Sequence, residues 1–150
     1  MTVTLTTTAI IPTFNRATFL VETLESVLSQ SLPPAEILII DDGSTDDTPQ
    51  RMEAYTDRIR YIRKENSGKA DSLNQSIGLA SHPLVWIVDD DDLVLPNTLE
   101  TLTGLFRDNP AIGFSYGRYE RFTVDAATGD MKTFDCGYWQ DVPPENFLIA

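Results

Sequence analysis

The hydrophobic positions of the chain form short runs that are separated by longer amphipathic stretches. The segments at residues 5–11, 37–40, 59–62 and 84–88 have the length of strands and carry many branched or aromatic side chains, which predicts β-structure. The run at 37–40 is continuously apolar, as is typical of a strand buried on both faces of a parallel sheet, and the run at 84–88 also indicates a buried strand. We expect Pro12 to end the first strand, because proline cannot donate a hydrogen bond to a central ladder.

The stretches between these strands are predicted to be helices. The first helix is expected to have Thr18 as its N-cap and to end before Pro33, and the second covers residues 46–55. The fourth has Pro96 in its first turn and closes at Asn109. Apolar residues at helical spacing mark one face of the first, third and fourth helices: Leu20, Leu24, Val27 and Leu28; Leu73, Ile77 and Ala80; Leu99, Leu102 and Phe106.

The alternation of strands and helices predicts an α/β fold in which a mainly parallel sheet is flanked by helices. Such units have right-handed crossovers, and their ligands bind beyond the carboxyl ends of the strands. After residues 112–116 the alternation of strands and helices ends. Two strands at 119–124 and 131–134, joined by a turn at 127–130, predict an antiparallel hairpin.

Composition narrows the classes of function. The chain has 150 residues, enough for one substantial core, and we expect a single domain. Its net charge of −12 argues against nucleic acid or an anionic membrane surface as a partner. The chain has one cysteine, so we expect no internal disulfide and a cytoplasmic location. No apolar stretch approaches the ~18 residues of a membrane span.

Polar clusters follow three of the predicted strands, at the edge where ligands are expected. A single cluster also has ordinary structural explanations: Asn15 could fix a turn, Asp42 and Gly43 could form one, and Ser44 or Thr45 could cap a helix. The three clusters are Pro12-Thr13-Phe14-Asn15-Arg16, Asp41-Asp42-Gly43-Ser44 and Asp89-Asp90-Asp91-Asp92.

The four consecutive aspartates from Asp89 to Asp92 are the most informative cluster. Carboxylates this close repel one another and raise one another's pKa values unless a cation compensates them. Their position at the mouth of a parallel sheet favours a hard divalent cation, Mg²⁺ or Mn²⁺, which prefers oxygen ligands. A diphosphate could approach so acidic an edge if that cation bridged its oxygens to the carboxylates.

Four motifs in order along the chain resemble those of family-2 glycosyltransferases, and the resemblance extends from Thr8 to about Phe147. It implies the glycosyltransferase A-type, Rossmann-like fold, in agreement with the strand and helix alternation. It also divides the chain into a nucleotide-sugar-binding core at residues 1–110 and the start of an acceptor-side region at 111–150. The motifs are Ile10-Ile11-Pro12-Thr13-Phe14-Asn15-Arg16; Ile39-Ile40-Asp41-Asp42-Gly43-Ser44-Thr45-Asp46; Asn66-Ser67-Gly68-Lys69 with Asn74; and Val88-Asp89-Asp90-Asp91-Asp92 with Pro96.

The resemblance assigns roles to individual residues. Asp41 is expected to hydrogen-bond the base, most commonly uracil, and Lys69 to reach the nucleotide. Asp89 and Asp91 match an aspartate–any–aspartate motif, with Asp91 the expected direct ligand of Mn²⁺ or Mg²⁺ and Asp89 or Asp90 nearer the ribose and sugar. The complete predicted nucleotide site consists of Pro12, Thr13, Phe14, Asn15, Arg16, Asp41, Asp42, Asn66, Gly68, Lys69, Asp89 and Asp90, with the metal on Asp91 and Asp89.

By the same resemblance, the reaction is transfer of a sugar from a nucleotide-diphosphate sugar, UDP-linked in the simplest case, to a hydroxyl with inversion. The acceptor is a saccharide or a lipid-linked molecule, which suits polysaccharide synthesis for the cell envelope at the inner face of the membrane. No catalytic base is assigned, because none of the later acids lies in a recognisable base motif: Asp125, Asp130, Asp135, Asp141 and Glu145.

Other classes of protein remain as alternatives. We expect the chain to be part of a longer domain that supplies the base, and the main alternative is a catalytically silent nucleotide-sugar-binding module. Receiver domains and aspartate-dependent phosphatases also gather acids at strand ends. They place them after the first strand, where this chain has Pro-Thr-Phe-Asn.

Overall fold

A computed structural model of the chain describes residues 5–125 and 127–137. These residues form two compact units, with the boundary between residues 112 and 113. The first unit contains the sheet and its helices, and the second contains a hairpin. None of the helices in the described ranges is long and apolar enough to cross a bilayer.

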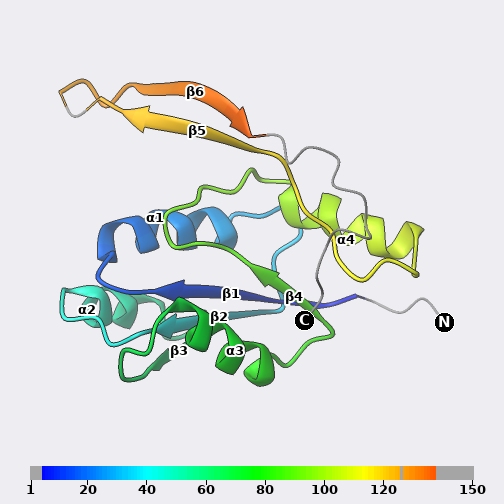
Figure 1. Cartoon of the computed structure of the whole chain (residues 1–150), viewed down its shortest axis with the longest axis horizontal. Coiled ribbons are helices and arrows are strands. Elements are labelled where there is room, and N and C mark those ends of the chain that lie inside the picture. The colour runs from blue at the N-terminus through cyan, green and yellow to red at the C-terminus, as the bar shows by residue number, and fades with distance from the viewer. Residues whose placement is uncertain (1–4, 126, 138–150) are drawn as a thin grey trace. The chain divides into compact units, whose positions relative to one another are not determined.

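The first unit is built on a four-stranded sheet with the order β3-β2-β1-β4. Its strands are β1 (Thr7–Thr13), β2 (Glu36–Asp41), β3 (Arg60–Arg63) and β4 (Leu84–Ile87), and every neighbouring pair is parallel. The predicted parallel sheet is therefore confirmed. In Figure 1, β1 runs through the middle of the sheet as the dark blue arrow.

The sequence predicts that Pro12 ends the first strand, but β1 continues through Pro12 to Thr13. Pro12 lies inside β1 and pairs in register with Ile40 of β2. Alternate residues of β1 form hydrogen bonds with opposite neighbours. The Thr13 carbonyl accepts from the N–H of Asp42, just after β2, and the Ile10 carbonyl accepts from the N–H of Val88, just after β4. Pro12 therefore faces the β4 side, where the pairing of β1 with β4 has already ended at Ile10 and no ladder donor is required.

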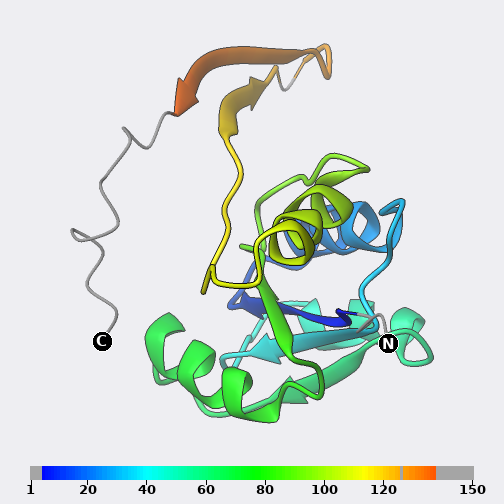
Figure 2. The same cartoon turned by 90° about the vertical axis from the view of Figure 1, so that its right-hand side faces the viewer.

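Helices cover both faces of this sheet. α1 (Ala17–Leu28) and α4 (Thr98–Asp108) lie on one side and α3 (Lys69–Leu79) lies on the other, as both views show (Figures 1 and 2). α2 (Thr48–Met52) continues as a short 3₁₀ turn, Glu53–Tyr55. The larger core cluster lies under α1: Ala9, Ile11, Leu20, Leu24, Val27, Ile37, Ile39, Met52 and Val88. The smaller cluster lies under α3: Ile10, Leu38 and Ile40, with Ile62 and Leu73 packed against it.

Two helix starts differ from the sequence prediction. Thr18 is not the cap of α1, which begins at Ala17; the Ala17 N–H is held instead by the Asp46 carboxylate at 3.2 Å. Sequence periodicity cannot reveal this acceptor, because it comes from a loop 29 residues away. Pro96 precedes the N-cap of α4, Asn97, and so lies outside the first turn.

Two apolar patterns also have a different burial from the one expected. The buried residues of α3 are Ser72 and Ser76; of the predicted apolar stripe, Leu73 packs on the smaller core cluster, whereas Ile77 is 49% exposed. β4 is an edge strand, and its alternate residues Val85 and Ile87 are exposed, so it is not buried on both faces.

The strand order creates a switch point beside β1. From β1 the chain passes to β2 and β3 on one side and later returns to β4 on the other. Crossovers on the two sides of such a point leave a crevice beyond the carboxyl ends of the strands, where ligands of open α/β sheets bind. The loops after β1 and β4 flank this crevice.

The second unit contains the predicted antiparallel hairpin. β5 (Tyr119–Val124) pairs with β6 (Met131–Gly137), with an irregularity between Arg121 and Phe122. The turn includes Gly129 with φ of 75°, a conformation that favours glycine. The hairpin is confirmed, and β6 is longer than the expected 131–134.

Candidate functional site

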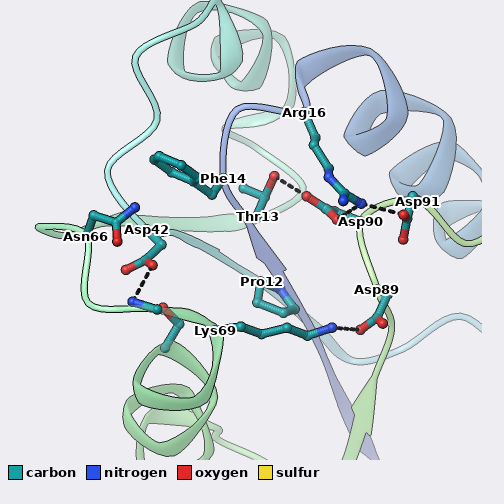
Figure 3. A pocket seen from close by; sticks show the side chains of 12 residues that line it. Pro12, Thr13, Phe14, Arg16, Asp42, Asn66, Lys69, Asp89, Asp90 and Asp91 are labelled. Carbon is teal, nitrogen blue, oxygen red and sulfur yellow. Dashed lines mark hydrogen bonds and ion pairs between the residues drawn. The ribbon is translucent and has the colours of Figure 1, made fainter.

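A cavity of about 560 Å³ opens at the carboxyl ends of the strands. Its size lies within the range of small-molecule sites, roughly 300–1,000 Å³. Figure 3 shows Phe14, Asn66 and Asp42 toward one end and Arg16, Asp89, Asp90 and Asp91 toward the other, with Pro12 and Lys69 between them. The lining residues are Pro12, Thr13, Phe14, Arg16, Asp42, Asn66, Gly68, Lys69, Ser72, Asp89, Asp90 and Asp91.

Most of the predicted nucleotide and metal residues therefore lie around one cavity. Of the predicted nucleotide and metal residues, Asn15 and Asp41 are absent from its lining, and Ser72 is a lining residue that the sequence did not single out. Ser72 was missed because a serine inside a helix carries no motif signal. Its buried position on α3 is a property of the fold.

Asn15 has a structural role beside the cavity. It is the one non-glycine residue with positive φ, at 53°, in the described part of the chain, and asparagine tolerates this conformation. Its Oδ1 accepts from the Thr45 N–H at 2.7 Å, and its own N–H donates to Ser44 Oγ at 2.9 Å. Asn15 thus ties the loop after β1 to the loop after β2, which fixes a turn as one of the sequence alternatives proposed.

Asp41 is fully buried, with both of its oxygens engaged inside the protein. Oδ1 accepts from the Ser44 N–H at 2.8 Å, and Oδ2 accepts from the Tyr61 hydroxyl. Burial and this bond raise the pKa of Tyr61. Asp41 is the last residue of β2 and is not among the residues that line the cavity, so its expected contact with the base stays a prediction.

Asp42, one residue later, lines the cavity where Asp41 does not. Its Oδ1 accepts from the Lys64 ammonium at 2.5 Å and from the Ser67 N–H at 2.9 Å, and its Oδ2 accepts from the Gly68 N–H at 2.7 Å. Burial alone would raise the pKa of Asp42, but these three donors outweigh it and hold that pKa below its usual value. Asp42 is a carboxylate that stays ionised in a fixed orientation.

Two glycines permit this arrangement. Gly43 has φ of 81°, and a side chain there would come within 3.0 Å of the Asn66 backbone nitrogen. Gly68 has φ of 92° at the N-terminus of α3, where its N–H meets Asp42. Each glycine therefore allows a backbone course that brings the loop after β3 against the loop after β2.

Two basic side chains offset part of the negative charge at the acidic end of the cavity. Lys69 reaches Asp89 at 2.7 Å, and Arg16 contacts Asp91. The side chains of Asp89 and Asp91 are 43% and 46% exposed. Lys69 and Arg16 therefore offset only part of the negative charge of the four aspartates, and the predicted divalent cation remains a prediction.

Asp90 differs from its neighbours because it is buried. Its carboxylate accepts a 2.7 Å hydrogen bond from Thr13 and lies 3.5 Å from Arg16. Burial is the main reason that the pKa of Asp90 lies above its usual value, and the charge of Asp91 adds to it despite the contacts with Thr13 and Arg16. Asp90 thus links the loop after β4 to the end of β1.

The described residues contain no group of three or more histidine, cysteine or acidic side chains arranged to hold a metal ion. Asp89 and Asp91 offer two exposed carboxylates on one rim of the cavity. This fits an ion that takes one or two protein carboxylates and completes its shell with substrate phosphates and water, as Mg²⁺ commonly does.

Acids of the second unit have structural roles where they are described. The Asp125 carboxylate accepts from the N–H groups of Ala127 and Thr128, which lowers its pKa, and Asp130 accepts from the Thr128 hydroxyl. Both hold the hairpin turn. Asp141 and Glu145 lie outside the described residues, as does the side chain of Asp135.

The family model for glycosyl transferase family 2 matches residues 8–147. This chain belongs to glycosyl transferase family 2. The resemblance of its four motifs is thereby confirmed, and the match covers both units of the structure. The glycosyltransferase GlyG of Streptococcus pneumoniae is a relative with 36% identity over 144 residues, which cover 93% of this chain and 46% of GlyG.

Solved structures of similar proteins confirm the glycosyltransferase A-type fold for this family-2 chain. S. aureus TarS 1-349 in complex with UDP-GlcNAc has a TM-score of 0.65 and 27% identity, covering 70% of this chain and 32% of TarS 1-349. The mannosyltransferase PcManGT from Pyrobaculum calidifontis, in complex with GDP-Man and Mn²⁺, has a TM-score of 0.63 and 28% identity over 69% of this chain and 32% of PcManGT. The chain spans less than half the length of each of these proteins.

Proposed function

We propose that this chain binds the donor of a metal-dependent, inverting glycosyltransferase, and that the donor is a UDP-sugar. The observation that carries the proposal is a single cavity at the switch point of the sheet, with the fixed carboxylate of Asp42 at one end and the exposed pair Asp89 and Asp91 at the other. One end suits a base and the other suits a diphosphate with its cation.

The base is proposed to lie at the Asp42 end, against Phe14. Phe14 is 43% exposed and offers a ring on which a base can stack. Asp42 Oδ2 accepts one protein N–H, so a lone pair remains for a ring N–H of the ligand. Uracil carries such an N–H between two carbonyl groups, whereas neutral adenine and cytosine carry none at the matching position. UDP-GlcNAc in the similar TarS structure supports uracil as the base.

The diphosphate is proposed to lie toward Asp89 and Asp91. A bound Mn²⁺ or Mg²⁺ would be held by these two carboxylates and would neutralise charge on the departing UDP. Lys69 and Arg16 line the same end and carry positive charge for phosphate oxygens. The Mn²⁺ complex of PcManGT supports a divalent cation.

Titration calorimetry of UDP with and without Mn²⁺ tests the donor site. We expect Mn²⁺ to tighten UDP binding about ten-fold, a usual size for coupling between two ligands. The variant Asp91→Ala should remove most of this coupling. Asp57→Ala, an exposed acid away from the cavity, is the matched control and should retain it. Equal UDP affinity with and without Mn²⁺ in the unaltered chain would contradict the metal-bridged diphosphate.

Activity is a separate measurement. Metal-dependent release of UDP from a UDP-sugar supports an enzyme, and the anomeric configuration of the transferred sugar, read by NMR, tests inversion. Tight UDP binding without turnover, both in this chain and in a version extended past Ala150, would contradict transfer and support the silent binding module.

A further inference from the structure

Ser72 combines three properties that no catalytic or packing role described above explains. It is fully buried, it lines the cavity, and its hydroxyl has no hydrogen-bond partner among the described residues. Buried polar groups in proteins nearly always have a partner, and one without a partner at a binding cavity points to a ligand.

Comparison with other buried hydroxyls isolates Ser72. Ser76 is buried one turn later on α3, and its hydroxyl donates to the Leu73 carbonyl at 2.9 Å. Thr23 and Thr48 also have hydroxyls without partners in the described part of the chain, but neither residue lines the cavity. Among the described residues with an unpartnered buried hydroxyl, Ser72 is therefore the one that lines the cavity.

Ser72 lies at the Asp42 end of the cavity. Its N–H donates to the Gly68 carbonyl at 3.1 Å, which places it one helical turn after Gly68. Residues four apart share one face of a helix, and the N–H of Gly68 points to the Asp42 carboxylate. Ser72 and Asp42 therefore both lie near the N-terminal end of α3, and both line the cavity.

A uracil ring satisfies both groups together. Its N3–H lies between two carbonyl oxygens, so a carboxylate that accepts from N3 leaves a carbonyl acceptor on either side. We propose that the Ser72 hydroxyl donates a hydrogen bond to one carbonyl oxygen of the uracil base, an inference that rests on the donor site proposed above. Ser72 is then a specificity-determining contact of the base subsite.

The test is a double-substitution cycle that combines variants of Ser72 with UDP analogues altered at either carbonyl oxygen of uracil. UDP, 2-thio-UDP and 4-thio-UDP are titrated in the presence of Mn²⁺ into the unaltered chain, Ser72→Ala and the matched control Ser76→Ala. Sulfur is a weak acceptor, so each analogue weakens a bond to one position. Thermal unfolding of each variant reports on folding.

We expect Ser72→Ala to weaken UDP binding roughly three- to ten-fold, the usual size of one neutral hydrogen bond. With the unaltered chain, one of the two thio analogues should bind more weakly than UDP by a similar factor. With Ser72→Ala, that analogue should bind as tightly as UDP does. Ser76→Ala should bind UDP normally. A purely structural role for Ser72 would lower affinity for all three ligands equally, and that result would overturn the inference.

Failure of the inference is distinguishable from failure of the donor site. If the unaltered chain binds UDP with Mn²⁺ dependence and Ser72→Ala binds it equally well, the base contact is wrong and the donor site stands. If the unaltered chain does not bind UDP, both are wrong.

Discussion

The two ends of the cavity hold their carboxylates in different ways. Asp42 is buried and receives three hydrogen bonds, from Lys64 and from two backbone N–H groups. Asp89 and Asp91 are roughly half exposed, and each contacts one flexible basic side chain. One carboxylate is fixed by the fold, and the other two are held by partners that can leave.

This difference matches what each end must do. A base is recognised by fixed geometry, so the acceptor must be oriented before the ligand arrives. A cation and a diphosphate arrive with their own charges, so the protein charges at that end must be able to exchange partners. Lys69 and Arg16 offset part of the charge of the acidic run, and both can turn to phosphate oxygens once a cation is present.

The largest effect is expected from removing the fixed carboxylate. Asp42→Ala should weaken UDP binding about 10- to 100-fold, as is usual when a hydrogen bond to a charged group is lost. It should also lower the free energy of unfolding, because the Lys64 ammonium and the N–H groups of Ser67 and Gly68 lose their acceptor. Calorimetry and urea unfolding measure the two effects.

Asp57→Ala serves again as the control, with normal binding and stability expected. If Asp42→Ala bound UDP normally while losing stability, Asp42 would be a structural residue only. The proposal that the Asp42 end of the cavity recognises the base would then be wrong.

Much of the fold was accessible from sequence because it rests on local patterns. Four short apolar segments and the periodic stretches between them predicted the parallel sheet and its helices. What failed depended on neighbours distant in sequence. Pro12 continues a central strand because β4 has already separated from β1, and Ile87 is exposed because α3 packs on β1 and β2 rather than on β4.

The site was predictable to a similar degree. Strand ends identified the clusters that line the cavity, since parallel strands bring their carboxyl ends together. Sequence could not separate Asp41 from Asp42, because the direction of each side chain depends on where β2 ends. Nor could it reveal Ser72, whose importance comes from burial and from a missing partner.

An intermediate effect is expected from removing one exchangeable partner. Lys69→Gln frees Asp89, so it should bind Mn²⁺ alone about two- to five-fold more tightly, the scale of an exposed ion pair. The same variant should bind UDP in the presence of Mn²⁺ more weakly, because a phosphate contact is lost. Tighter binding of Mn²⁺ together with weaker binding of UDP would show that Lys69 exchanges Asp89 for a phosphate oxygen.

Paramagnetic resonance of free Mn²⁺ measures the first affinity and calorimetry measures the second. Lys132→Gln, an exposed lysine of β6, removes the same charge as a control and should change neither affinity substantially. Mn²⁺ binding that is unchanged or weaker in Lys69→Gln would show that Lys69 does not compete with the cation.

The smallest effect concerns Asp90, which belongs to the acidic run by sequence but is buried as Asp42 is. Asp42 has its pKa lowered by its donors, whereas burial raises the pKa of Asp90. A carboxyl group with a raised pKa in the folded state contributes its full stability below the ordinary aspartate pKa of about 4, and loses it as pH rises through the raised value. Asp90→Asn avoids this loss and still accepts from Thr13.

Asp90→Asn should therefore be slightly more stable than the unaltered chain at neutral pH, and the difference should vanish as the pH falls below about 4. Urea unfolding across this pH range measures it. Lower stability of Asp90→Asn at neutral pH would mean that the contacts with Arg16 and Thr13 outweigh burial. Asp90 would then be a second fixed carboxylate, and only Asp89 and Asp91 would belong to the exchangeable end.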